Sequence, residues 1–312
     1  MAALICGSLA YDVIMVFQDY FKNHILPDKV HMLNVSFLVP SMRREFGGCA
    51  GNVAYTLKQL GSEGYPLGTV GEDFDPYAQW LDSHGISRRF IQTVPNSFTA
   101  QAFITSDLAD NQITAFHPGA MAFSEQRTVP TDADISVGMV SPDSREGMLA
   151  HAEQFKAAGI PFIFDPGQAM PLFDAADLEH LIELADWVTV NDYEFELIRE
   201  RTGLSVTDIA ERVRALIVTC GAKGSYILTT AERIHIPSAA VSEVVDPTGC
   251  GDAYRAGLLY GMMHDMDWET TGRIASLAGA IKVEKPGTQN HQFTLEEFKD
   301  RFAENFGYRF TE

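Results

Sequence analysis

The sequence has few cysteines, and none of them lies in a pattern that binds a metal or builds a disulfide framework. Only four occur among 312 residues, at positions 6, 49, 220 and 250, and no two form a Cys-x-x-Cys pair. We therefore expect four reduced thiols. The nine histidines also form no His-Glu-x-x-His or similar pattern, so the sequence predicts no structural transition metal.

Long apolar runs are missing as well. Stretches such as residues 162–164 and 215–218 have the length of a strand, far short of the ~20 residues that a membrane helix needs. The N-terminus enters an apolar run at once, with no basic region and no plausible cleavage site. These features predict a cytoplasmic protein that does not span a membrane.

Basic residues are scarce, with 23 lysines and arginines against 42 acidic residues and a net charge of -19. No run of basic residues is longer than two, so we expect no nucleic acid partner. Net charge describes the whole surface. It does not exclude a small anion such as ATP that has its own local site.

Alternating segments fill the chain from about residue 135 onward. Strand-like runs at 137–140, 161–164 and 187–190 are separated by helical segments that end near 158 and 185. This alternation predicts an α/β fold with a mainly parallel central sheet and helices on both faces, in three layers.

The first part of the chain has a different pattern of predicted strands and helices. Residues 15–44 and 99–116 are rich in Phe, Val, Ile and Thr with partial alternation, which predicts strands of a second, smaller sheet. Glycine-terminated helices are expected at 52–60 and 75–84, the first preceded by a flexible turn at 47–51. We expect a single domain, 1–312, with a small β lid formed by about 13–45 and 97–118.

Several polar or glycine-rich segments follow strand-like runs: 7–12, Asp165, Asn191, 219–224 and 246–252. Ligands of an open parallel sheet bind beyond the carboxyl ends of its strands. The sequence therefore predicts that these segments converge on one cleft.

The segment 246–257 is the strongest local signal. Gly249 and Gly251 let backbone N–H groups approach a ligand, and the helix that follows adds its positive end to form an anion hole. Asp252, in the first turn of that helix, is suited to accept a proton from an attacking hydroxyl. Taken alone, such a segment is more often a tight turn with an ordinary helix-start acid.

Residues 246–257 resemble the second signature of the ribokinase-like (PfkB) family of carbohydrate and purine kinases, and residues 47–54 resemble its first signature. The resemblance implies a ribokinase-like three-layer α/β/α fold and phosphoryl transfer from ATP. It assigns Asp252 as catalytic base, and the backbone of Gly249, Cys250 and Gly251 as the anion hole that stabilises the transferring phosphoryl group.

Two further segments resemble the nucleotide side of this family. Asn191 and Glu194 match an Asn-x-x-Glu element in which the glutamate binds Mg²⁺ through water and the asparagine approaches the ATP phosphates. By itself the element is also a common helix start. Residues 219–224 resemble the ATP loop, with Thr219, Gly221 and Gly224, together with Gly251, as nucleotide-binding residues; by itself this segment is also a hairpin. No Walker loop occurs.

The acceptor side resembles bacterial adenosine kinases more than ribokinases or fructokinases, through residues 7–12, 34–39 and 116–121. The resemblance implies that some residues hold the ribose hydroxyls and that others line the base pocket. Asp12, Asn52 and the Gly48 backbone would hold the ribose hydroxyls. Ser8, Ser36 and Phe116 would line the base pocket, with Ser36 and Phe116 on the lid. Gln168 is a further substrate-binding residue. Phe116 could also belong to the core of the lid.

The sequence departs from those relatives at 167–172, where only Gln168 carries over, and at Ala102, where they have an aromatic residue. The resemblance implies phosphorylation of the adenosine 5′-hydroxyl, giving AMP. A ribokinase-like sugar kinase, a kinase for another nucleoside and a silent nucleoside-binding protein are the alternatives.

Two properties stay open in the sequence. Asp246 and Thr248 lie where such relatives bind potassium, but no charge pattern is unique to that site. A homodimer through the edge of the lid sheet is a further expectation from the family.

Overall fold

A computed structural model describes residues 2–25, 32, 34–109, 111–131 and 133–311. Among these residues, nine strands form a central sheet in the order β13-β12-β11-β10-β9-β8-β1-β4-β5. Their bounds are β1 (Ala2–Cys6), β4 (Gly64–Val70), β5 (Ile91–Thr93), β8 (Ile135–Val140), β9 (Phe162–Phe164), β10 (Trp187–Asn191), β11 (Ala215–Thr219), β12 (Ser225–Leu228) and β13 (Arg233–Ile236). All pairs from β5 to β11 are parallel, and β12 and β13 add an antiparallel edge.

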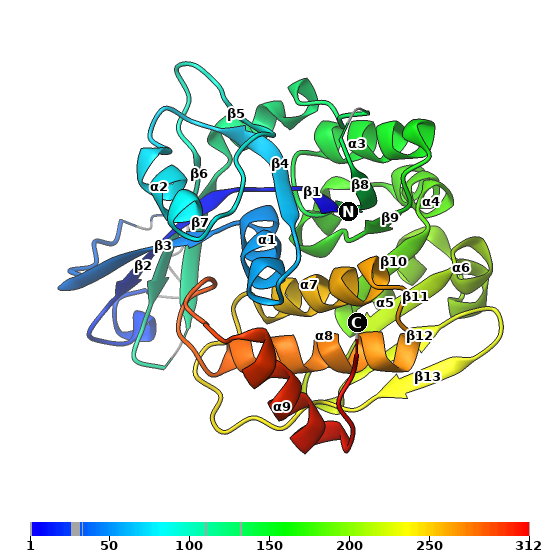
Figure 1. The fold of residues 1–312 in the computed structure, drawn as a ribbon. Coiled ribbons are helices and arrows are strands. Elements are labelled where there is room, and N and C mark those ends of the chain that lie inside the picture. The colour runs from blue at the N-terminus through cyan, green and yellow to red at the C-terminus, as the bar shows by residue number, and fades with distance from the viewer. Residues whose placement is uncertain (1, 26–31, 33, 110, 132, 312) are drawn as a thin grey trace.

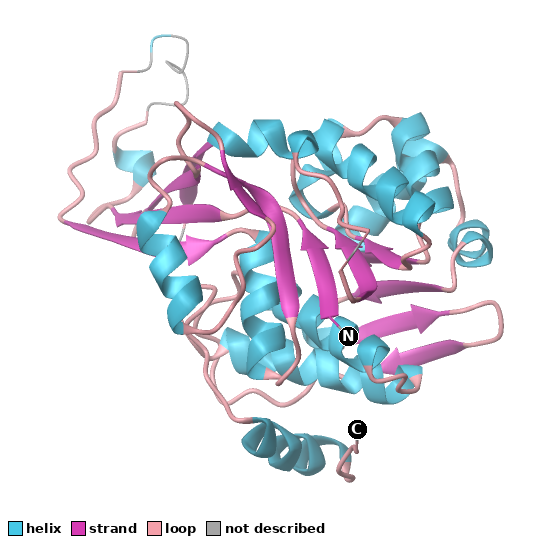
Figure 2. Cartoon of the chain, turned by 45° about the horizontal axis from the view of Figure 1, so that its top comes forward, coloured by secondary structure: helices cyan, strands magenta, loops and turns pink. Residues whose placement is uncertain are grey.

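Helices cover both faces of this sheet (Figures 1 and 2). One apolar core packs against α1 (Cys49–Gln59), α2 (Asp75–Ser83), α7 (Cys250–Met263), α8 (Trp268–Val283) and α9 (Leu295–Phe306). The other packs against α3 (Arg145–Ala158), α4 (Ala175–Leu184), α5 (Asp192–Thr202) and α6 (Val206–Arg212). The expected three-layer α/β/α fold is therefore confirmed.

Helices α7 and α8 lie in close contact at Gly257. A Cβ atom on Gly257 would lie only 2.4 Å from the Ala275 Cα atom, so no larger residue fits without separating the two helices. This contact fixes the axis of α7 and therefore the direction in which its N-terminus points.

A second, four-stranded sheet lies to one side of the molecule, at the left of Figure 1. Its order is β3-β2-β6-β7, with β2 (Ala10–Val16), β3 (Ser41–Gly47), β6 (Ala100–Ser106) and β7 (Gln112–His117). This is the expected small sheet. The segment between β2 and β3 contains the short 3₁₀ helix η1 (Phe21–Asn23), whereas no helix is expected there from the sequence. Residues 26–31 and 33 of the expected lid lie outside the described residues.

Two local expectations differ from the structure. The helix expected at 52–60 begins at Cys49, because the turn is completed at Gly48, which has φ +87°. The segment 246–252 follows irregular backbone rather than a strand, since the last strand before it, β13, ends at Ile236. In the part of the chain that the structure describes, no helix has the length and apolar character needed to cross a membrane.

Candidate active site

A cavity of about 1170 Å³ lies at the carboxyl ends of the parallel strands, between the two sheets. The segments expected to converge there do so. The sequence-predicted site residues that line the cavity are Ser8, Asp12, Gly48, Asn52, Phe116, Gln168, Asn191, Glu194, Thr219, Gly221, Gly249, Gly251 and Asp252. Ser36, Cys250 and Gly224 are not among the lining residues.

The N-terminus of α7 opens into this cavity. Gly249 is the N-cap residue and has φ +78°, a left-handed conformation that favours glycine. The Cys250 N–H group donates to the Pro247 carbonyl at 3.1 Å, so it is already paired, whereas Gly249 and Gly251 line the cavity. The first turn of a helix leaves N–H groups without intrahelical partners, and its dipole favours an anion there. This end of the cavity is therefore suited to a phosphate group.

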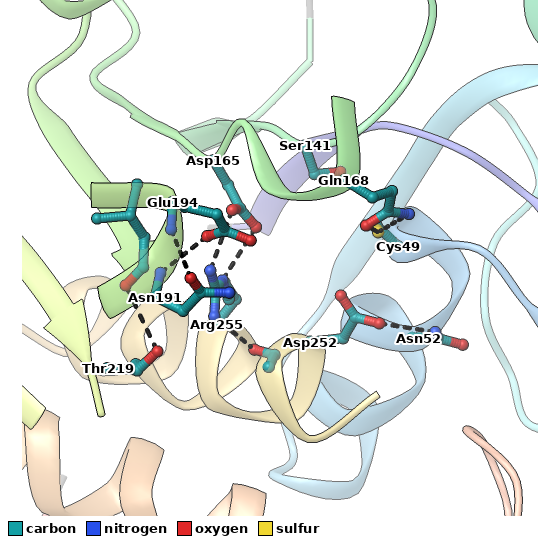
Figure 3. Close-up of polar contacts among 12 residues, drawn as sticks. Cys49, Asn52, Ser141, Asp165, Gln168, Asn191, Glu194, Thr219, Asp252 and Arg255 are labelled. Carbon is teal, nitrogen blue, oxygen red and sulfur yellow. Dashed lines mark hydrogen bonds and ion pairs between the residues drawn. The ribbon is translucent and has the colours of Figure 1, made fainter. Parts of the chain in front are cut away.

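Asp252 lies in the first turn of α7 and is bound by Asn52 of α1. The Asn52 Nδ2 atom donates to the Asp252 Oδ2 atom at 2.7 Å (Figure 3). The Asn52 Oδ1 atom in turn accepts from Gln289 Nε2 at 3.0 Å, and Gln289 Oε1 accepts from Trp80 Nε1 at 2.9 Å. Because an indole N–H can only donate, this chain of bonds fixes the orientation of both amides. Asn52 therefore presents a donor, not an acceptor, to Asp252.

The ionisation of Asp252 is shifted toward the neutral form. Burial raises its pKa to about 6, and Asp165 acts in the same direction, while the Asn52 donor and Arg255 oppose the shift. A carboxylate with this pKa is ionised near neutral pH and is a stronger base than an exposed aspartate.

Asp12 on β2 is another acidic side chain of the cavity. Burial raises its pKa to about 6, and the charges of Asp252, Glu45 and Asp246 add to the shift. No hydrogen bond joins its carboxylate to any of the described residues. Its oxygens are therefore available to a ligand with hydroxyl groups.

Ser8 and Gly48 form the turn on which α1 begins. The Ser8 Oγ atom accepts from the Cys49 N–H group at 3.1 Å, and the Ser8 carbonyl accepts from Ala50 at 3.0 Å. A Cβ atom on Gly48 would lie 2.5 Å from that carbonyl oxygen and 2.7 Å from the Ala10 nitrogen. Glycine is required here both by φ and by space, and this brings the start of α1 against the segment 8–10 at the start of β2.

A buried ion pair lies behind Asp252. Arg255 binds the Asp165 carboxylate with two nitrogens, at 2.9 and 3.0 Å, and the two residues are only 5% and 3% exposed (Figure 3). The Arg255 Nη1 atom also donates to the Gly251 carbonyl at 3.4 Å. This pair connects the end of β9 to the first turn of α7, and both residues line the cavity.

Asn191 and Glu194 form a reciprocal cap at the start of α5. The Asn191 Oδ1 atom accepts from the Glu194 N–H group at 2.7 Å, and the Glu194 Oε2 atom accepts from the Asn191 N–H group at 2.8 Å. Burial raises the pKa of Glu194, and the nearby Asp165 carboxylate adds to the shift. Both residues still face the cavity, so the common helix start and the expected phosphate-side position coexist.

The donor set on this side suits Mg²⁺ that arrives with a nucleotide. The described residues contain no group of three His, Cys, Asp or Glu side chains that could hold a metal alone. Mg²⁺ is usually bound by one or two carboxylates together with waters and phosphate oxygens. The part-buried Glu194 carboxylate offers such a ligand.

The segment 219–224 forms a hairpin turn that contributes one wall. β11 and β12 pair antiparallel, and the Cys220 N–H group donates to the Gly224 carbonyl at 2.8 Å. Gly224 has φ +84°, and a Cβ atom there would lie 2.1 Å from the Ile236 carbonyl oxygen. Thr219 and Gly221 face the cavity, whereas Gly224 shapes the turn from behind.

The small sheet forms the opposite wall. Phe116 on β7 is 51% exposed, so it is not part of the lid core, and it pairs across the sheet with Ala102, which also faces the cavity. Ser36 is exposed and lies in irregular backbone, outside the strands on which it was expected. Gln168 lies in a 3₁₀ turn, with its Nε2 atom 3.6 Å from the Cys49 Sγ atom.

A third wall went unnoticed in the sequence. Asp143, Ser144, Arg145 and Glu146 line the cavity where β8 passes into α3. Asp143 is 2% exposed and accepts the Ser144 N–H group at 2.8 Å, and burial raises its pKa to about 7. The signal that would have found this wall is its position just after the strand-like run at 137–140, at the same sheet edge.

These ionisations predict a pH profile. Asp252 and Asp12 both have a pKa of about 6, above that of an ordinary aspartate, so both become protonated as the pH falls through about 6. If ionised Asp252 accepts a proton, kcat/KM should be level above pH ~7 and fall steeply below pH ~6. Initial rates at saturating ATP across this range would check it. A profile that stays level down to pH ~5 would contradict the assignment.

Comparison with known proteins shows full-length similarity to kinases. A family model described as pfkB family carbohydrate kinase matches residues 13–294. The nucleoside kinase of Methanocaldococcus jannaschii is 34% identical over 290 residues, covering 92% of this chain and 94% of that protein. The nucleoside kinase of Methanothermobacter thermautotrophicus is 30% identical over 306 residues, covering 95% of this chain and 97% of that protein.

Solved structures show the same similarity. The nucleoside kinase of Burkholderia thailandensis in complex with inosine is 50% identical with a TM-score of 0.90, covering 98% of this chain and 99% of that one. Its complex with ADP-inosine is 52% identical with a TM-score of 0.87, covering 98% of this chain and 97% of that one.

Proposed function

This chain belongs to the pfkB family of carbohydrate kinases, and we propose that it transfers the γ-phosphoryl group of ATP to the 5′-hydroxyl of adenosine, giving AMP and ADP. One observation carries the proposal. A single cavity joins an anion-binding helix start and a carboxylate base to a second carboxylate, Asp12, whose oxygens are available to ligand hydroxyls.

In the proposed reaction, an Asp252 carboxylate oxygen takes the proton of the 5′-hydroxyl as the 5′-oxygen attacks the γ-phosphorus atom. The bond from that phosphorus to the β–γ bridging oxygen breaks, and ADP leaves. The N–H groups of Gly249 and Gly251 donate to the oxygens of the transferring group. Mg²⁺ bound with ATP, near Glu194 and Asn191, would neutralise charge on the phosphates.

Two features favour a nucleoside over a free sugar as acceptor. The cavity, at about 1170 Å³, exceeds the ~300–1,000 Å³ typical of a site for one drug-sized ligand, so it has room for ATP and a second large molecule. The Methanocaldococcus and Burkholderia relatives are both named nucleoside kinases. Asp12, Asn52 and the Gly48 backbone would hold the ribose, and Phe116, Ser8 and Gln168 would face the base.

Inosine is the second candidate acceptor, because the Burkholderia enzyme was solved with inosine bound. Inosine and adenosine share the ribose and differ at the purine 6-position, so the same hydroxyl-binding residues serve both.

A substrate panel tests the proposal. ATP consumption should be measured with adenosine, inosine, guanosine, ribose and fructose under one set of conditions. We expect kcat/KM to be highest for adenosine and lowest for the free sugars. A higher value for ribose or fructose would identify a sugar kinase, and no consumption with any acceptor would favour a binding protein. A cytoplasmic location, a role in purine salvage and a homodimer through the small sheet stay predictions.

A further inference from the structure

A fully buried lysine lies next to the proposed anion hole. Lys282, in the last turn of α8, is 0% exposed. Its Nζ atom donates to the Asp246 carbonyl at 2.6 Å and to the Lys285 carbonyl at 3.2 Å. Lysine is almost never fully buried unless its charge is compensated. The full burial of Lys282 therefore needs a physical explanation.

Lys282 lies where two segments join. One is the segment that begins at Asp246 and leads into the anion hole; the other follows α8. The Asp246 Oδ2 atom accepts from the Gly287 N–H group at 2.9 Å, and the Val283 carbonyl accepts from the Asp246 N–H group at 3.0 Å. The ammonium group, bound to a carbonyl of each segment, holds them together from within.

The local charges fit a permanent cation there. Burial lowers the pKa of Lys282, but the Asp246 carboxylate opposes that shift, as do Cys250 and Asp252. The carboxylate itself is held in place, since its Oδ1 atom accepts from the Thr248 N–H group at 2.9 Å. An ammonium group that binds two carbonyl oxygens beside a carboxylate charge has the kind of environment that a bound monovalent cation would have.

We propose that the Lys282 ammonium group acts as a tethered monovalent cation that positions the 246–249 segment, and that phosphoryl transfer by this protein therefore needs no bound potassium. Lys282 is a positioning residue. It acts through the Asp246 carbonyl on Gly249 and Gly251, and it does not line the cavity. The proposal rests on the proposed kinase activity only for its kinetic test.

The unmodified protein gives the first test. Potassium is replaced by tetramethylammonium at equal ionic strength, because salt alone changes electrostatic interactions. We expect kcat to stay the same within about twofold, since the cation is already part of the chain. Activation of several-fold by potassium would overturn the proposal.

Lys282→Ala gives the second test, because it removes the ammonium group and opens space for an added cation. We expect kcat to fall at least ~10-fold, as for loss of a group that organises oxyanion donors, while the KM for the acceptor changes little. Potassium or ammonium ions should restore part of the lost rate. A variant with unchanged kcat, or one that no cation restores, would overturn the proposal.

Lys285→Met is the matched control. Lys285 is exposed, and its printed hydrogen bonds with Lys282 use only its backbone N–H and carbonyl groups, so this variant should behave as the wild type in every salt. If Lys282→Ala does not fold, Lys282→Gln keeps a hydrogen-bond donor without the charge. We expect that variant to fold and to lose at least ~10-fold in kcat. An unchanged kcat would contradict the role of the charge.

Thermal stability separates this inference from the proposed function. The midpoint of unfolding of Lys282→Ala should rise with potassium more than with tetramethylammonium, whereas that of the wild type should respond equally to both. This measurement needs no substrate. If the protein lacks kinase activity, the proposed function fails and the unfolding data still decide whether Lys282 replaces a cation. Equal responses of the variant to the two salts would overturn the inference.

Discussion

Replacing Asp252 by asparagine should lower kcat roughly 10²- to 10⁴-fold, the range expected for loss of a general base. The amide has nearly the shape of the carboxylate, and it can still accept the Asn52 hydrogen bond that now measures 2.7 Å. The start of α7 should therefore keep its geometry, and only the ability to take up a proton is lost. Adenosine binding should be largely retained.

Turnover at saturating ATP and acceptor, together with acceptor binding by calorimetry, would check this result. Asp75→Asn is a matched control. Asp75 is also the first acidic residue of a helix, but it is exposed and lies outside the cavity, so kcat should be unchanged. Near-normal turnover of the Asp252 variant would refute its role as the base.

Much of the site was predictable because its residues lie in short continuous segments. Gly249, Gly251 and Asp252 occupy one turn, and glycines next to a helix start have few structural alternatives. The rule that parallel strands end at one edge then brought Asn191 and Thr219 to the cavity that Asp252 reaches from the start of α7. Local chemistry and sheet topology agreed, which is why the prediction of one cleft was confirmed.

The contacts that the sequence did not predict join residues far apart in the chain. Gln289 contacts Asn52, and Arg255 contacts Asp165, across 237 and 90 positions respectively. Gln289 stands in no local pattern that marks it. Asp165 and Arg255 belong to segments that the sequence does mark, but their pairing could not be predicted, because a buried contact depends on how helices and strands pack. Gln289 is informative only once α1 and the segment after α8 are known to be neighbours.

The exact start of helix α1 could not be predicted from the sequence either. Glycine-rich residues 47–51 suggested a flexible turn, but Gly48 alone makes the turn and the helix starts directly after it. Gly51 lies inside helix α1. A Cβ atom at this position would lie 2.0 Å from the Tyr77 hydroxyl oxygen, so only glycine fits there. The glycine has a packing role at that position, and composition cannot distinguish packing from flexibility.

Replacing Asp12 by alanine should weaken adenosine binding severely and also reduce the discrimination between adenosine and 2′-deoxyadenosine. In the proposed site, the Asp12 carboxylate accepts hydrogen bonds from both ribose hydroxyl groups. A nucleoside that lacks one hydroxyl leaves this part-buried charge with one hydrogen bond too few, which costs about 1–3 kcal/mol of binding free energy. In the wild type, this corresponds to roughly 5- to 150-fold in kcat/KM between the two nucleosides. Asp12→Ala removes the group that distinguishes the two nucleosides, so the ratio of their kcat/KM values should fall.

The assay belongs above pH ~7, where Asp12 is ionised because its pKa is about 6. Glu45→Gln is the charge-matched control. Glu45 pairs with Asp12 in the register of β2 and β3 but is not among the cavity-lining residues. It changes the local charge as much as Asp12→Ala does, so it should keep the full discrimination. If Asp12→Ala also keeps it, Asp12 does not bind the ribose hydroxyls, and the acceptor must lie against a different wall of the cavity.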